Sequence, residues 1–180
     1  LPLPILPAQI LWINLITDGL PSVALAFEPA ESAIMKDRPR LLSQPIMNKQ
    51  MKFQIFTIGL VSDVGLFAIY FFLLGRSFQI DEIRTIIFLA LGLNSLLYVF
   101  AVRKIRTNIW RSNPFENKWL IFAVVIGLAL QFLPIVIPSL RDMFNFTTLS
   151  LWEVEIVFGI SIFKLILIEL TKFYSYKVKS

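Results

Sequence analysis

Long apolar runs, each close to the length needed to cross a lipid bilayer, dominate this sequence. There are five, at about residues 5–27, 54–75, 84–102, 118–138 and 151–173. About 20 helical residues span the hydrocarbon core of a bilayer. Backbone polar groups in lipid must be hydrogen-bonded within their own segment, and these runs do not alternate in polarity as barrel strands do. We therefore expect an all-α membrane protein, a bundle of five transmembrane helices.

The composition agrees with a membrane protein. The 180 residues are 57% hydrophobic and only 16% charged, whereas soluble domains are about 45–50% apolar and about 25% charged. The sequence has no cysteine and no histidine, which excludes disulfides, thiolate or imidazole metal sites, and Ser-His or Cys-His catalysis. A metal ion bound by these side chains would have oxygen ligands, as hard cations such as calcium and magnesium prefer.

Basic residues gather on alternate sides of the predicted helices. Residues 28–52, 103–118 and 172–180 are rich in lysine and arginine, whereas the other two connections contain only Arg76 and Arg84, and Arg141. The positive-inside rule places the basic set in the cytoplasm. The N-terminus is then expected on the extracytoplasmic side and the C-terminus in the cytoplasm. Because the net charge of +5 follows topology, nucleic acid is not expected as a partner.

The first apolar run contains a polar cluster, in the stretch WINLITDGLP at residues 12–21. Asn14 lies three residues before Thr17 and four before Asp18, so the three side chains share one face of a helix. A carboxylate at the bilayer centre costs on the order of 2.5–3.5 kcal/mol. The cluster is therefore expected to face a partner, water or an ion, and its oxygen ligands suit calcium. The alternative is that it only forms hydrogen bonds with neighbouring helices.

Gly19 and Pro21 follow the cluster directly and predict a break in the helix. Glycine costs about 1 kcal/mol in a helix interior and proline about 3 kcal/mol. Pro21 has no amide hydrogen to donate to the carbonyl of Thr17, which leaves an oxygen free near Asp18. Interrupted membrane helices that expose carbonyls beside acidic side chains form midplane cation sites. The stretch therefore predicts a partial cation site that other helices complete.

The stretch NLITDGLPSVALAFEPAESAIMKDRPR, Asn14 to Arg40, resembles the sixth transmembrane helix and following cytoplasmic loop of type II P-type ATPases. It is most similar to the sarco/endoplasmic-reticulum type of calcium pump, whose pattern of Asn, two residues and Thr-Asp-Gly-Leu-Pro is matched without a gap. The resemblance covers essentially the whole chain as helices six to ten, with supporting matches at RSNPFENKW and IELTKF. The chain opens at Leu1 almost directly on an apolar run and has no signal peptide, so we expect a piece of a longer protein.

The resemblance implies that Asn14, Thr17 and Asp18 are cation ligands, with Asp18 the central one. Sodium/potassium pumps have an acid where this chain has Asn14, so the amide favours calcium. The family's phosphorylated Asp-Lys-Thr-Gly-Thr loop, its nucleotide-binding domain and its ligand-bearing helices four and five are not in this sequence. No catalytic residue is expected here, and ATP and magnesium are expected only in the full-length protein. The expected partners are the rest of the same pump, namely helices one to five and the cytoplasmic ATPase domains, and the bilayer.

The resemblance also bears on stoichiometry. Two-site calcium pumps carry a glutamate at the position of Ser95, next to Asn94, so its absence predicts a single calcium ion per cycle. Hydrogen bonding between helices is the other interpretation of Asn94 and Ser95. Asp18 without its cation is an uncompensated charge in a medium of low dielectric constant. We therefore expect it to take up a proton when the ion leaves, which gives proton counter-transport.

Further charges lie at membrane depth in the second and fifth predicted helices. Asp63 and Lys164 have opposite charges and are expected to form an intramembrane pair, because an unpaired charge there is costly. A role for Asp63 in the ion path is the alternative. Glu153 and Glu155 lie at the outer rim and are expected to be solvated.

These observations favour the C-terminal membrane part of an ATP-driven calcium pump, a translocase that is multi-pass in the plasma membrane or an intracellular membrane. A pump for manganese or a monovalent cation is one alternative. A membrane scaffold without transport activity is the other.

Overall fold

The computed structural model describes residues 1–29, 45, 47, 49–103, 113 and 115–177. Within these residues the chain is all-helical, with no strand. Most of the basic loop that was predicted to face the cytoplasm, including Lys36, Arg38 and Arg40, lies outside them.

The first predicted span is one continuous helical segment built of three parts. The parts are α1 (Pro7–Asn14), a π-helical turn η1 (Leu15–Gly19) and α2 (Leu20–Leu25). Pro7 begins α1, a position where its missing amide hydrogen costs nothing. The backbone of Asn14, Gly19 and Leu20 remains in the right-handed helical region. The break predicted from Gly19 and Pro21 is therefore a wider helical turn, and the chain does not unwind there.

Each of the other predicted runs also falls in a helix, and one short helix was not predicted. The remaining elements are α3 (Lys49–Gly75), α4 (Ile80–Val102), α5 (Lys118–Val136), α6 (Pro138–Phe144) and α7 (Leu151–Lys177). Pro134 lies inside α5, and Ile137 takes an extended conformation before Pro138 starts α6. A proline lacks the amide donor that would continue the helix, so α5 ends and the short α6 begins.

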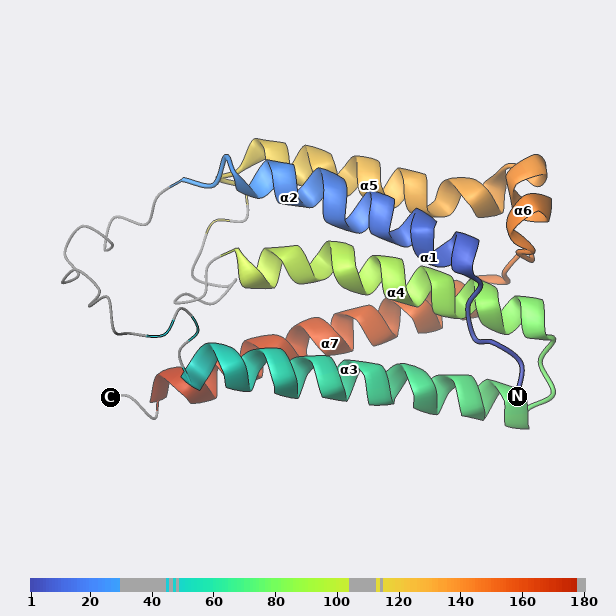
Figure 1. Ribbon diagram of the computed structural model, residues 1–180, viewed down its shortest axis with the longest axis horizontal. Helices are drawn as coiled ribbons and strands as arrows, with labels where there is room; N and C mark the ends of the chain where they lie inside the picture. The colour runs from blue at the N-terminus through green and yellow to red at the C-terminus, as the bar shows by residue number, and fades with distance from the viewer. Residues whose placement is uncertain (30–44, 46, 48, 104–112, 114, 178–180) are drawn as a thin grey trace.

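The helix α4 lies at the centre of the bundle and contacts α1, α3, α5 and α7 (Figure 1). Its residues Ile83, Phe88, Leu93 and Leu96 are completely buried. The first segment and α5 cover one side of α4, and α3 and α7 cover the other (Figure 1). The end of α7 lies at the opposite end of the bundle from the N-terminus (Figure 1).

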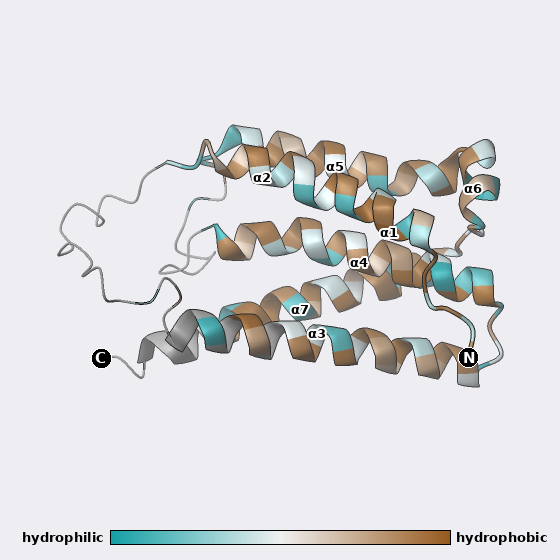
Figure 2. Ribbon diagram, in the orientation of Figure 1, coloured by the Kyte–Doolittle hydropathy of each residue, from teal (hydrophilic) through white to brown (hydrophobic). Residues whose placement is uncertain are grey.

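The outer faces of the helices are apolar, as expected for surfaces in contact with lipid. Large side chains such as Leu60, Phe122 and Phe163 are exposed. Figure 2 shows hydrophobic residues along most of the helices and hydrophilic ones at the start of α4 and in α6. By length and hydropathy, three helical stretches in the described residues are long and apolar enough to cross a membrane: Pro7–Leu25, Ile80–Val102 and Lys118–Val136. The other two predicted spans, in α3 and α7, remain predictions.

Candidate cation site

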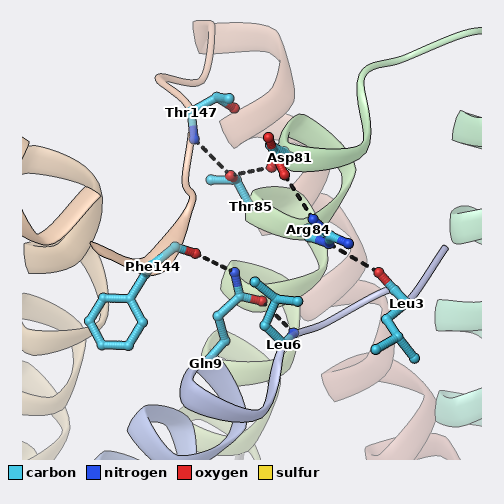
Figure 3. Close-up of polar contacts among 8 residues, drawn as sticks. All are labelled: Leu3, Leu6, Gln9, Asp81, Arg84, Thr85, Phe144 and Thr147. Carbon is cyan, nitrogen blue, oxygen red and sulfur yellow. Dashed lines mark hydrogen bonds and ion pairs between the residues drawn. The ribbon is translucent and has the colours of Figure 1, made fainter. Parts of the chain in front are cut away.

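The predicted ligands lie in a helical segment that is fixed to its neighbours at both ends. Before the ligands, the amide of Gln9 donates from Nε2 to the carbonyl of Phe144 (2.8 Å) and accepts at Oε1 from the amide of Leu6 (2.9 Å) (Figure 3). Gln9 is completely buried. Trp12 donates from its indole nitrogen to the carbonyl of Leu130 (3.2 Å), and its ring meets that of Phe144 edge-on at 5.4 Å. These contacts fix the start of the segment against α5 and α6.

The same end of the bundle is tied together by further polar contacts. Arg84 donates to the carbonyl of Leu3 and pairs with Asp81, and the hydroxyl of Thr85 accepts from the amide of Thr147 (3.0 Å) (Figure 3). The segment before α1 and the loop after α6 are therefore both held on the first turns of α4.

After the ligands, a second set of contacts fixes the end of α2; we call it the Asn117 anchor. It consists of Asn117, the carbonyl of Ala24, Glu28 and Arg103. Nδ2 of Asn117 donates to the carbonyl of Ala24 (3.0 Å) and to Oε2 of Glu28 (3.0 Å). Nη1 of Arg103 lies 3.5 Å from Oε1 of Glu28. The anchor joins the end of α2 to the end of α4 and the start of α5.

Between the two anchored ends lie the three predicted ligands. Asn14 is the last residue of α1, and Thr17 and Asp18 lie in η1. The core-facing residues Ile13 and Ile16 are buried, whereas Asn14 and Asp18 are exposed and Thr17 is half-buried. Asn14 and Asp18 therefore lie on a face of the segment that this chain leaves uncovered. π-helical turns within α-helices often occur at functional sites, because the wider turn changes the direction of side chains and carbonyls.

The donor set fits a hard cation but is incomplete. An amide, a hydroxyl and a carboxylate supply oxygen ligands, and calcium takes 6–8 of them. No group of three or more acidic residues that could hold a metal ion occurs in the part of the chain that the structure describes. Asn14, Thr17 and Asp18 alone therefore supply fewer oxygen ligands than calcium takes.

A large groove near Asp18 is apolar and separate from the predicted ligands. It has a volume of about 590 Å³ and lies between the first segment and α5, with Leu15, Gly19, Phe27 and Trp119 among its lining residues. Neither Asn14, Thr17 nor Asp18 lines it. Its apolar walls do not suit an ion.

The predicted pair of Asp63 and Lys164 interacts electrostatically, but without a close salt bridge among the described residues. The ammonium of Lys164 lies 5.7 Å from the centre of the Tyr98 ring, a cation–π contact. Asp63 is exposed on α3 and lines a separate groove of about 220 Å³ beside Ile5 and Tyr70. Among the described residues there is no ion pair between the two. A ring face within about 6 Å attracts an ammonium directly, so Lys164 has this contact in addition to the more distant charge of Asp63.

Asn94 and Ser95 occupy different environments on α4. Ser95 is exposed, whereas Asn94 is buried. Oδ1 of Asn94 has no hydrogen-bond partner among the described residues.

Glu153 is not solvated, contrary to the prediction, although Glu155 is exposed. Oε2 of Glu153 accepts from the amide of Ser150 (2.6 Å) and from its hydroxyl (2.5 Å) at the start of α7. Ser-Leu-Trp-Glu at residues 150–153 is the sequence signature of a capping box. That signature was present in the sequence and was missed.

The sequence interpretation also missed the residues that fix the two ends of the segment. Gln9, Trp12 and Asn117 act through contacts with residues far away in the chain. Only Asn117 had a local signal, because asparagine directly before a helix is a frequent N-cap, and its Oδ1 does accept from the amide of Leu120 (3.0 Å).

Comparison with known proteins relates this chain to cation-transporting ATPases. The family described as "Cation transporting ATPase, C-terminus" matches residues 2–174. A "Calcium-transporting ATPase" of Bacillus subtilis is 32% identical over 162 residues, which cover 89% of this chain and 18% of that protein. "Calcium-transporting ATPase 1" of Bacillus cereus is 32% identical over 187 aligned residues, covering 94% of this chain and 21% of that protein.

The name of another relative specifies a cation but not calcium. The "Probable cation-transporting ATPase F" of Mycobacterium tuberculosis is 29% identical over 143 residues, covering 79% of this chain and 16% of that protein. The chain thus spans about a fifth or less of the length of each of these relatives.

Proposed function

Because the chain belongs to the family of cation-transporting ATPase C-terminal regions, we propose that it is the C-terminal membrane part of an ATP-driven calcium pump in which Asn14, Thr17 and Asp18 bind the ion. The resemblance to P-type calcium ATPases is confirmed, and the chain is part of a multi-pass integral membrane protein. In the proposal, the rest of the same pump supplies the remaining ligands, the ATP and magnesium sites and the phosphorylated residue.

One observation carries the proposed site. Asp18 is a carboxylate on an uncovered face of a π-helical turn, inside an otherwise apolar helix that is fixed at both ends. A carboxylate at membrane depth persists where it meets a partner or an ion. The uncovered face is where other helices of a longer pump would bring their ligands, and the incomplete donor set in this chain agrees with that arrangement.

The choice of calcium rests on the donor set and on the relatives. An amide, a hydroxyl and one carboxylate give a flexible set of oxygen ligands of the kind that calcium accepts. The names of the two Bacillus relatives specify calcium, whereas the mycobacterial name specifies only a cation. Manganese or a monovalent cation is therefore the second candidate.

A non-transporting scaffold is the remaining alternative. A scaffold without transport activity gives no physical reason for the polar side chains of Asn14 and Asp18 to lie together on an uncovered face of an irregular helical turn. An upstream reading frame that encodes an Asp-Lys-Thr-Gly-Thr sequence would support the pump, and a genomic context without one would support the scaffold.

The decisive experiment is Asp18→Asn in the full-length protein. Calcium-dependent phosphorylation from ATP should be abolished, because the segment then offers the ion no carboxylate. Thr17→Val should be milder, since a hydroxyl is a neutral ligand that water can replace. Ser22→Ala is the matched control, because Ser22 is also exposed on this segment and lies four residues beyond Asp18. Near-normal calcium affinity in Asp18→Asn would place the site elsewhere.

A further inference from the structure

We propose that Asn117 is a positioning residue for the cation site, which holds α2 in the rotation that presents Asp18 to the ion. This inference rests on the proposed function. It concerns a residue on a different helix from the predicted ligands.

Asn117 uses its whole side chain to join two helices. An asparagine side chain offers two amide hydrogens and one carbonyl oxygen. The nitrogen donates to the carbonyl of Ala24 and to Glu28, both 3.0 Å away, and the oxygen accepts from the amide of Leu120 at 3.0 Å. The residue is 2% exposed, so water does not compete for these bonds.

Arg103 strengthens the connection from a third helix. Its side chain is 1% exposed, and Nη1 lies 3.5 Å from Oε1 of Glu28. Its Nη2 donates to the carbonyl of Asn113. Glu28 is therefore held between Asn117 and Arg103, and removing one member of such a buried set leaves a charge without compensation.

The Asn117 anchor is close enough to Asp18 to control the direction in which the Asp18 side chain points. Ala24 lies six residues beyond Asp18 in a segment whose backbone stays helical, a rise of about 9 Å. Because Gln9 and Trp12 fix the other end of the segment, the Asn117 anchor determines how η1 is rotated between them. Without it, α2 would be held on α5 mainly by apolar contacts, which are not directional.

The test is Asn117→Asp in the full-length protein. Aspartate is as good an N-cap as asparagine, so the start of α5 is kept. Both hydrogen bonds that Nδ2 donates, to the carbonyl of Ala24 and to Glu28, are lost, and a carboxylate then faces Glu28. The calcium concentration that gives half-maximal phosphorylation from ATP should rise about tenfold, the combined effect of the two lost hydrogen bonds, with the maximal level unchanged.

A second substitution supplies the rescue. Glu28→Gln combined with Asn117→Asp restores the link between positions 28 and 117 with its direction reversed, while the hydrogen bond to the Ala24 carbonyl stays lost. Calcium dependence should therefore recover in part, to within about threefold of wild type. Asp81→Asn is the control, because it removes the ion pair with Arg84 at the other end of α4 and should leave calcium dependence unchanged. A merely structural role would lower the maximal level and the thermal stability without moving the half-saturating concentration.

The outcomes separate this inference from the proposed function. An unchanged half-saturating concentration in Asn117→Asp, or no recovery in the double variant, overturns the positioning role. If wild-type phosphorylation responds to manganese or sodium and not to calcium, the proposed ion is wrong, and the variants are compared with the cation that works. If no cation has an effect, the proposed function fails.

Hydrogen exchange of residues 15–25, measured in the absence of cations, then decides whether Asn117 fixes this segment. Faster exchange in Asn117→Asp supports the positioning role, and unchanged exchange overturns it.

Discussion

At the scale of single residues, the contact between Gly92 and Gln131 fixes how closely α4 and α5 approach. Gln131 is completely buried, and its Nε2 donates to the carbonyl of Phe88 at 2.9 Å. A Cβ atom at Gly92 would lie 2.1 Å from that nitrogen. The amide of Gln131 therefore occupies the space that any other residue at position 92 would need.

We expect Gly92→Ala to lower the stability of the full-length protein by about 1–3 kcal/mol, because the Gln131 side chain must move and give up its hydrogen bond. Thermal unfolding in detergent measures the change. Gly159→Ala is the control, since no neighbouring atom lies within 4 Å of a Cβ there; alanine in a helix is favoured over glycine by about 0.5–1 kcal/mol. Adding Gln131→Ala to Gly92→Ala should recover part of the loss. Wild-type stability in Gly92→Ala would contradict the packing described.

At the scale of the element, the π-helical turn links the sequence of the first segment to its proposed chemistry. Pro21 follows η1 at the start of α2 and is buried. An alanine at this position would have an amide hydrogen that can donate to a carbonyl of the preceding turn, which proline cannot do. Pro21→Ala should therefore favour regular α-helix over the π-helical turn.

In Pro21→Ala, the calcium concentration that gives half-maximal phosphorylation should rise by roughly threefold to tenfold, because one backbone carbonyl oxygen is withdrawn from the site. Calcium-dependent phosphorylation measures it. Pro138→Ala is a suitable control, because Pro138 is exposed and starts the short α6. An unchanged calcium dependence in Pro21→Ala would mean that the irregular turn contributes nothing to binding.

The elements differ in how far the sequence alone predicts them. The long helices follow from local composition, because a helix in lipid satisfies its own backbone. The sequence located the polar cluster and an irregularity of the helix at residues 14–21. It did not indicate that the irregularity is a π-helical turn. The anchors were missed because their contacts join residues 135 positions apart for Gln9 and 93 apart for Asn117. The pairing of Asp63 with Lys164 stays a prediction, because the structure gives an electrostatic interaction between them without a close salt bridge, and charge alone did not indicate the nearby ring of Tyr98.

At the scale of the whole molecule, the bundle has two chemically different ends, and the proposed topology assigns each to one side of the membrane. The Asn117 anchor lies at the end where α2 and α4 finish and α5 begins, and the basic stretches of the sequence, residues 28–52 and 103–118, connect elements from this end. The turn between α3 and α4 lies at the other end. By the positive-inside rule we expect the first end to face the cytoplasm.

Labelling of single cysteines in intact cells tests this topology. Ser77→Cys should react with an impermeant reagent from outside, and Phe115→Cys should react only after the membrane is opened, because both positions are exposed at opposite ends of the bundle. This chain has no native cysteine to interfere. Labelling of Phe115→Cys and not of Ser77→Cys from outside would reverse the orientation.

The number of ions per cycle is a property of the complete pump that this chain constrains. The acid expected for a second calcium site is replaced by Ser95, which is exposed on α4, and the first segment offers one carboxylate. We therefore expect a single calcium ion per phosphorylation site at saturation, and equilibrium binding that gives two would refute this.

When that ion leaves, Asp18 would be an uncompensated charge at membrane depth, which is costly, so it should take up a proton and release it when calcium returns. Reconstituted vesicles that accumulate calcium should then become alkaline inside, because each inward calcium is exchanged for outward protons. The Asp18→Asn variant should show neither calcium uptake nor a pH change. Active calcium uptake with no pH change, in vesicles shown to hold a proton gradient, would rule out the coupling while leaving the cation site in place.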